Sequence, residues 1–151
     1  MKPIFEAIYL EGNEEHIFTQ KDLEGSYSLI YFYPKDMTPG CTLEACEFRD
    51  NYNFFISKNI KVYAVSGDSL ESHSKFSTQH NLPFILVSDT SHSMSRAFDV
   101  YKQKSMFGKK YMGIERSTFI IGPQGEILYK WEKVKPIGHT QEVKRKFEEI
   151  L

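Results

Sequence analysis

Short apolar runs and longer runs with helical spacing alternate along the first part of the chain. Three runs are apolar and bounded by Gly, Pro or polar residues, which is typical of buried strands: residues 26–33, 60–66 and 84–88. Residues 41–59 place their apolar side chains at roughly helical spacing. A second helix is expected to begin after Asp68 or Ser69, either of which can cap it, and to run towards His80. The pattern predicts a βαβ unit with parallel strands.

The rest of the chain predicts an antiparallel addition to this parallel core. A short helix is expected over residues 91–98 and a final helix over residues 140–151. Between them, "STFII" and "EILYKW" flank a turn signal at residues 122–125, which predicts a hairpin. Residues 101–114 show weak periodicity and are expected to be a loop with possible strand pieces. The fold class is therefore α/β, with an antiparallel hairpin at one side of the sheet.

Size and charge limit the classes of function. The 151 residues match the usual size of one domain, so we expect a single domain over residues 1–151. The 19 Lys and Arg residues nearly balance the 20 Asp and Glu residues, which gives no indication of a nucleic acid or membrane-surface partner. The N-terminal residues lack a secretory signal pattern, and no stretch approaches the roughly 20 apolar residues of a membrane span. We therefore expect a soluble cytoplasmic protein.

Both cysteines of the chain lie in one segment, "YFYPKDMTPGCTLEACEFRD" (31–50). Two thiols in a chain without an export signal indicate a reduced, working or metal-binding pair rather than a structural framework. Cys41 falls in the first turn of the expected helix, where unpaired N–H groups and the helix dipole favour a thiolate. An ordinary buried cysteine is the alternative interpretation. Gly40, which allows close backbone approach, and the Thr38 hydroxyl favour the reactive interpretation.

The spacing of Cys46 from Cys41 favours a reversible disulfide. Five residues along an ideal helix correspond to about 7.5 Å of rise and roughly 140° of rotation, so the two thiols cannot bond while the helix is intact. As a structural staple, a loop of about six residues would stabilise the fold by only about 2 kcal/mol. Zinc is disfavoured because Cys-x-x-x-x-Cys is wider than the common spacing and the histidines form no paired ligand motif. We expect no metal and no cofactor.

The same segment resembles a known family. Pro34, Thr38 and Cys41 match the Pro-x-x-x-Thr-x-x-Cys signature of peroxiredoxins, and residues 31–50 resemble the active-site segment of the bacterioferritin-comigratory-protein or Q-type subfamily. The resemblance extends to "GKKYMGIERSTFIIGPQGEI" and "WEKVKPIGHTQEV", and so covers the chain from about residue 27 to the end. The first 25 residues depart from the family, which usually carries an Ala-Pro-x-Phe step there.

The resemblance implies a thioredoxin-like fold, with a central mixed sheet flanked by helices and an N-terminal hairpin extension. It implies that Cys41 is the peroxidatic cysteine, that Cys46 is the resolving cysteine of the same subunit, and that Arg116 is the charged partner of the thiolate. Pro34 would shape the pocket and exclude water, and the Thr38 hydroxyl would face the peroxide. Spacing alone does not single out Arg116, because an Arg before an apolar run is usually a solvated strand end.

The implied activity is that of a thiol-dependent peroxidase acting on hydrogen peroxide and organic hydroperoxides. Its sulfenic acid would condense to an intramolecular disulfide, which thioredoxin or a glutaredoxin-type dithiol would reduce, and the protein would be monomeric. Two alternatives stay open. One is a thiol-disulfide exchange enzyme, although such proteins use Cys-x-x-Cys, and the other is a non-enzymatic redox sensor in which the unwinding helix acts as a switch.

Three further features are assigned no part in this chemistry. Glu44 fits the family pattern, but a Glu in the first helical turn is explained equally well by the helix dipole. His73 and His80 lie seven residues apart and are expected to be solvated surface histidines. The lysines at 102, 104, 109 and 110 are expected to lie on a solvated loop.

Overall fold

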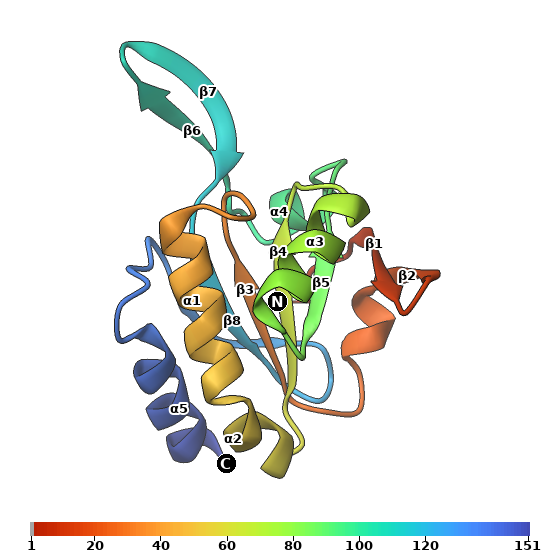
Figure 1. Ribbon diagram of the computed structural model, residues 1–151. Helices are drawn as coiled ribbons and strands as arrows, with labels where there is room; N and C mark the ends of the chain where they lie inside the picture. The colour runs from red at the N-terminus through yellow and green to blue at the C-terminus, as the bar shows by residue number, and fades with distance from the viewer. Residues whose placement is uncertain (1) are drawn as a thin grey trace.

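The computed structural model describes residues 2–151 and has a seven-stranded sheet at its centre (Figure 1). The strands of this sheet are β1 (Glu6–Glu11), β2 (Glu14–Thr19), β3 (Ser28–Phe32), β4 (Lys61–Ser66), β5 (Ile85–Ser88), β8 (Ser117–Ile121) and β9 (Ile127–Trp131). The helices are η1 (Gln20–Leu23), α1 (Pro39–Asp50), α2 (Tyr52–Ser57), α3 (Leu70–His80), α4 (Ser93–Ala97) and α5 (His139–Ile150). None of the helices within residues 2–151 has the length and apolar character that a membrane crossing requires.

The sheet is mixed, with the strand order β2-β1-β5-β4-β3-β8-β9. The pairs β3–β4 and β4–β5 are parallel, which confirms the predicted βαβ arrangement. Antiparallel strands complete both sides: β8 and β9 form the predicted hairpin next to β3, and β1 pairs with β2 and β5 at the other side. The N-terminal hairpin is therefore present although the sequence of this segment departs from the family pattern.

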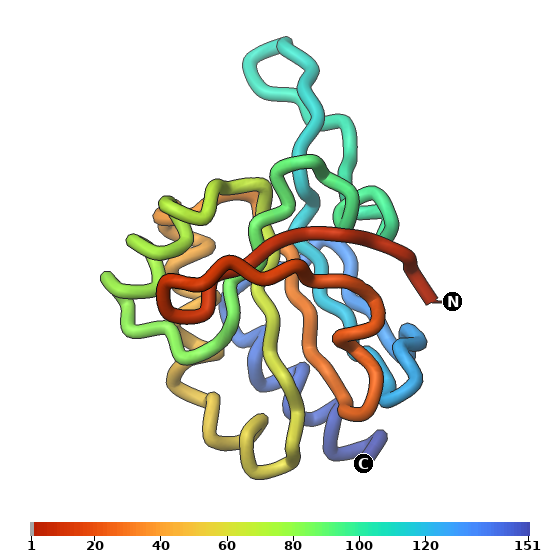
Figure 2. The backbone as a smooth tube through the Cα atoms, turned by 90° about the vertical axis from the view of Figure 1, so that its right-hand side faces the viewer, coloured from red at the N-terminus to blue at the C-terminus, as the bar shows by residue number. Residues whose placement is uncertain are grey.

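The two faces of the sheet are buried in two separate cores. On one face, Leu29 and Tyr31 of β3 pack in a core to which α1, α2, α3 and α5 all contribute. On the other face, Ile30 and Phe32 pack with residues of α4 and of the N-terminal segment, which crosses this side of the sheet in Figure 2. All five residues of β3 are buried because the strand lies inside the sheet, between β4 and β8. This central strand leads directly into the segment that carries the cysteines.

Residues 101–114 form a hairpin, so the prediction that this segment is mainly a loop was wrong, while the strand pieces it allowed for are present and make up most of the segment. The strands β6 (Tyr101–Met106) and β7 (Lys109–Ile114) pair antiparallel along their whole length and project away from the sheet (Figures 1 and 2). Phe107 and Gly108 form the turn, both with positive φ (52° and 79°). The segment shows weak periodicity because most of its length packs on no core, and so neither face needs to be apolar.

The helix predicted over residues 41–59 begins earlier and is broken in the middle. Thr38 is its N-cap and Pro39 its first residue, where a fixed φ and a missing N–H suit the helix start. α1 ends at Asp50. The side chain of its C-cap residue, Asn51, donates a 2.8 Å hydrogen bond to the carbonyl of Glu47, and α2 follows at once. An Asn side chain competes with the helix ladder in this way, which accounts for the break.

Candidate active site

The sheet register brings together two segments that lie far apart in the sequence. β3 pairs antiparallel with β8 such that Phe32 lies opposite Ser117. Arg116, one residue before Ser117, therefore lies beside the point where the chain leaves β3 for α1. The sequence spacing does not predict that Arg116 lies near the start of α1, because this proximity depends on the pairing of two strands that are not consecutive in the chain.

Cys41 lies at the third position of α1 and is 2% exposed. Its Sγ atom accepts a hydrogen bond from Nη2 of Arg116 at 3.3 Å. Gly40 makes this approach possible, since a Cβ atom built on Gly40 would lie 3.3 Å from the same nitrogen. The predicted helix-start position of Cys41 is thus observed, with a guanidinium against its sulfur.

Glu44 completes the surroundings of Arg116. Its Oε1 accepts a 2.7 Å hydrogen bond from Nη1 of Arg116, and the carboxylate is buried. Burial raises the pKa of Glu44 to about 7, against the opposing charge of the guanidinium. The helix dipole alone does not explain such a residue. Sequence reasoning left Glu44 outside the site, and the one signal that could have included it was its match to the family pattern.

Thr38 and Pro34 lie on the loop between β3 and α1. The Thr38 hydroxyl donates to the carbonyl of Lys35 at 3.0 Å and makes no cap hydrogen bond to α1. The first-turn N–H groups therefore stay available for an anion or a polar ligand. Pro34 is exposed and lines a hollow of about 390 Å³ whose opposite wall is the base of the β6–β7 hairpin. Lys104 lines the same hollow and is half-buried, and burial together with Arg116 lowers its pKa.

A buried hydrogen-bond network fixes this loop from the other side. Asp36 accepts hydrogen bonds from Tyr33 (2.5 Å) and Ser72 (2.8 Å), and one of its oxygens lies 2.7 Å from Nδ1 of His73. Nε2 of His73 lies 2.9 Å from the carbonyl of Val87. Both ring nitrogens thus face oxygen atoms, and the ring joins Asp36 on the loop to β5. The prediction that His73 is a solvated surface histidine was wrong, because it is 3% exposed and holds this loop to α3.

The network also contains a set of residue types that ligate metals. Asp36, Asp68 and His73 bring one ligand atom each within 4.8 Å of one another. These atoms already have protein partners: an oxygen of Asp68 accepts from the backbone N–H of Asp36 (2.8 Å) and from the Ser66 hydroxyl (2.6 Å). Burial alone would raise the pKa of Asp36, but the hydrogen bond and charge of His73 outweigh it and lower the pKa. The cluster is accounted for as the support of the cysteine-bearing loop.

Cys46 lies in a different environment from Cys41. It is half-buried on α1, and its Sγ lies 4.0 Å from Nδ1 of His80 on α3. Both cysteines are free thiols in this structure. His80 is half-buried, so its expected full solvation was also wrong. The two sulfurs therefore have separate basic or cationic neighbours while α1 is intact.

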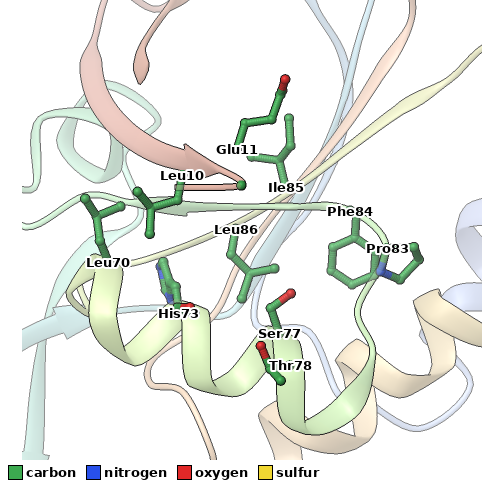
Figure 3. A pocket seen from close by; sticks show the side chains of 12 residues that line it. Leu10, Glu11, Leu70, His73, Ser77, Thr78, Pro83, Phe84, Ile85 and Leu86 are labelled. Atoms are coloured by element: carbon green, nitrogen blue, oxygen red, sulfur yellow. The ribbon is translucent and has the colours of Figure 1, made fainter. Parts of the chain in front are cut away.

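A second hollow lies away from both thiols. It has a volume of about 430 Å³ and separates α3 from the end of β1 and from β5 (Figure 3). Its walls include Leu10, Leu70 and Leu86, with the ring of His73 on α3 pointing between them. Neither cysteine nor Arg116 lines it, and we therefore place the candidate site at the start of α1 instead.

Comparisons with known proteins agree on one family. The model of the AhpC/TSA family matches residues 3–130. The peroxiredoxin Bcp of Bacillus subtilis is 50% identical over 133 residues, which cover 88% of this chain and 85% of that protein. A putative peroxiredoxin bcp of Coxiella burnetii is 44% identical over 141 residues, covering 93% and 91%. A structure of the Xanthomonas campestris bacterioferritin comigratory protein, described with its alkyl peroxide reduction activity, superposes with a TM-score of 0.87 at 41% identity, covering 94% of this chain and 89% of that one.

The chain belongs to the AhpC/TSA family and is a peroxiredoxin enzyme. The expected thioredoxin-like fold, a central mixed sheet flanked by helices, is confirmed by the same structural similarity. Membership implies a thiol-dependent peroxidase with a peroxide as substrate and a thiol as reductant. The roles of the individual side chains are a separate question.

Proposed function

We propose that Cys41 is the nucleophile that attacks the peroxide and that Cys46 resolves the product as an intramolecular disulfide. The observation that carries this proposal is the contact of Cys41 Sγ with Arg116 Nη2 in the first turn of α1. The guanidinium contacts this sulfur, and the N–H groups of the same turn have no side-chain cap, which together is an arrangement that stabilises a thiolate and the charge that develops on a peroxide.

Stabilising a thiolate is by itself a small part of the catalysis. Lowering the pKa of a generic thiol from about 8.5 to about 6 raises its ionised fraction at neutral pH roughly 30-fold. The same change lowers intrinsic nucleophilicity roughly tenfold at a Brønsted slope of about 0.4 to 0.5, so a gain of only a few-fold remains. The larger share must come from donors placed on the breaking O–O bond. We assign this task to Arg116, to the first-turn N–H groups, and to the Thr38 hydroxyl after it has turned away from the Lys35 carbonyl that it contacts in this structure.

The reaction then proceeds in two balanced steps. The Cys41 thiolate attacks the terminal peroxide oxygen, the O–O bond breaks, and the leaving alkoxide or hydroxide takes up a proton, leaving Cys41 as a sulfenic acid. The Cys46 sulfur then displaces hydroxide from Cys41, which leaves as water after protonation, and an S–S bond forms. Because five helical residues separate the two sulfurs, the first turns of α1 must unwind before this second step.

We also propose a substrate and a reductant. The hollow lined by Pro34 and Lys35, on the loop that leads into α1, has apolar surface from Met112 and Ile114, and we assign it the organic part of a hydroperoxide. The alkyl peroxide reduction described for the Xanthomonas campestris relative supports this assignment. We further propose that Pro34 keeps water from the thiolate. Thioredoxin or a glutaredoxin-type dithiol would reduce the disulfide of a monomeric, single-domain, cytoplasmic protein.

The test is peroxide consumption coupled to a thioredoxin system, for the intact protein and two single variants. Cys41→Ser should abolish consumption, including the first turnover. Cys46→Ser should keep a near-normal first oxidation of Cys41 but lose recycling, with a sulfenic acid that a dimedone-type reagent traps. Single-turnover oxidation in Cys41→Ser, or full turnover in Cys46→Ser, would reject the assigned roles.

A further inference from the structure

The environment of Cys46 contains a base that the mechanism has not used. Nδ1 of His80 lies 4.0 Å from Cys46 Sγ, across the interface between α1 and α3. Within residues 2–151, His80 Nδ1 has no hydrogen-bond partner other than Cys46 Sγ. A neutral imidazole with its proton on Nε2 would therefore direct the Nδ1 lone pair at the thiol. Shortening the contact by a few tenths of an ångström gives a good S–H···N hydrogen bond, and such contacts are often long before reaction.

The position of the His80 ring is fixed by its neighbours. Nη1 of Arg49, which lies on α1 three residues after Cys46, donates a 2.8 Å hydrogen bond to the carbonyl of His80. The ring also packs edge-on against Phe76, with 5.4 Å between centroids. Contacts therefore fix both the backbone and the side chain of His80. These contacts keep the imidazole ring close to the thiol of Cys46.

The charges around the pair favour transfer of the thiol proton to His80. His80 lies in the last turn of α3, where the helix dipole stabilises an imidazolium. Arg49 adds a second cation beside the sulfur, although Asp50 partly neutralises it through a 2.9 Å contact with Nε. Glu47, next to Cys46 on α1, opposes the formation of a thiolate. The C-terminal end of α3 and the guanidinium of Arg49 therefore favour proton transfer from Cys46 to His80, and the carboxylate of Glu47 opposes it.

We propose that His80 is a catalytic residue of the resolving step and accepts the thiol proton of Cys46. This inference rests on the proposed role of Cys46 as the resolving cysteine. The proton passes from Sγ to Nδ1 while α1 is folded, and the thiolate is then released towards Cys41 when α1 unwinds. The thiolate forms the S–S bond and displaces hydroxide, the hydroxide takes up a proton from solvent, and His80 returns its own proton to solvent. The sum is one sulfenic acid and one thiol giving one disulfide and one water.

The first experiment isolates Cys46. In a Cys41→Ser background, the rate of alkylation of Cys46 by iodoacetamide is measured from pH 5 to 9, with His80 intact and in His80→Asn and His80→Tyr. We expect the rise in rate to lie at clearly higher pH in both variants, with a roughly tenfold loss at pH 7 that vanishes at pH 9. His80→Tyr keeps an aromatic ring against Phe76. If both variants give the same profile, the change is due to the loss of the base and not to the loss of packing. His16→Asn, at a half-buried histidine of β2, serves as the control and should leave the profile unchanged.

The second experiment follows resolution itself. One equivalent of peroxide is added to the protein with both cysteines, and disulfide formation is timed by quenching and mass spectrometry. His80→Asn should slow this step roughly tenfold at pH 7 and leave the first oxidation of Cys41 unchanged. Alkylation profiles that are the same with and without His80 would overturn the proposal. Disulfide formation that becomes faster at every pH in His80→Asn would also overturn it, because His80 would then slow the unwinding of α1 instead of accepting a proton. Failure of the proposed function would appear differently, as full turnover in Cys46→Ser.

Discussion

At the scale of single residues, Glu44 couples the site to pH. Because burial raises its folded pKa to about 7 from an ordinary 4.5, the folded chain holds this proton more tightly than the unfolded chain. Its contribution to stability is therefore complete below about pH 4.5 and is lost as the pH rises through about 7. The shift corresponds to at most about 3 kcal/mol. Glu44→Gln cannot titrate and should lose less stability between pH 5 and pH 8 than the unchanged protein.

Urea unfolding of the reduced protein at the two pH values measures this difference, since the midpoint reports stability at constant slope. Glu71→Gln is a matched control, because Glu71 is an exposed helical Glu whose ion pair is a solvated 3.4 Å contact with Lys75. An equal pH dependence in Glu44→Gln and the unchanged protein would show that the carboxylate of Glu44 does not titrate in this range.

A substitution of Arg116 can show whether the rate of peroxide reduction depends on the geometry of the hydrogen-bond donors or on positive charge alone. Its two terminal nitrogens contact different partners, Cys41 Sγ at 3.3 Å and Glu44 Oε1 at 2.7 Å. Lys keeps the charge but cannot hold both contacts in a planar fork. Arg116→Lys should therefore reduce the second-order rate constant with peroxide by roughly 10- to 100-fold. Stopped-flow oxidation of Cys41 measures it, and a rate equal to that with Arg would mean that a point charge is enough.

At the scale of elements, the β6–β7 hairpin ends in a residue that does not suit its turn. Phe107 is 99% exposed and has a φ of 52°, followed by Gly108 at 79°. A two-residue turn with both φ positive prefers Asn-Gly. Phe107→Asn should stabilise the hairpin by about 0.4 to 1 kcal/mol and slow amide exchange of β6 and β7 roughly two- to fivefold. Phe107→Leu is the control, because Leu is apolar and does not favour a positive φ. Amide exchange as slow in Phe107→Leu as in Phe107→Asn would contradict this explanation.

The elements differ in how well the sequence predicts them. β3, β4 and β8 could be predicted from short apolar runs because both of their faces are buried, and α3 is capped by Ser69, one of the two residues predicted to cap it. The hairpin over residues 101–114 could not, since a projecting ribbon leaves no pattern of burial. The same limit applies to the site: Cys41 and Thr38 share one local signature, whereas Arg116 reaches Cys41 through strand pairing and His80 reaches Cys46 through helix packing. Such contacts depend on tertiary structure alone.

At the scale of the whole molecule, we expect the conformational change that accompanies the proposed disulfide to be confined to one helix. A bond between Cys41 and Cys46 requires unwinding of the start of α1, because disulfide geometry needs Cα atoms within about 6.8 Å and the intact helix separates them by about 7.5 Å of rise alone. Unwinding removes the contacts of Arg116 with Cys41 and Glu44 and exposes the α1 backbone. We expect β3, β4 and β8 to keep their pairing, because Cys41 and Ala45 are the members of the α1-side core in the stretch that unwinds and the core on the other face contains no residue of α1.

Hydrogen exchange of the oxidised and reduced protein should therefore differ locally. We expect amides of residues 41–50 to exchange at least roughly tenfold faster in the disulfide form, since their helical hydrogen bonds are lost. The end of α3 near His80, which loses its contacts with Cys46 and Arg49, should follow to a smaller degree. Amides of β3, β4 and β8 should stay unchanged. Cys46→Ser treated with one equivalent of peroxide is the control and should keep α1 protected. A disulfide confirmed by mass with α1 still protected, or a loss of protection that spreads through the sheet, would contradict a change confined to this helix.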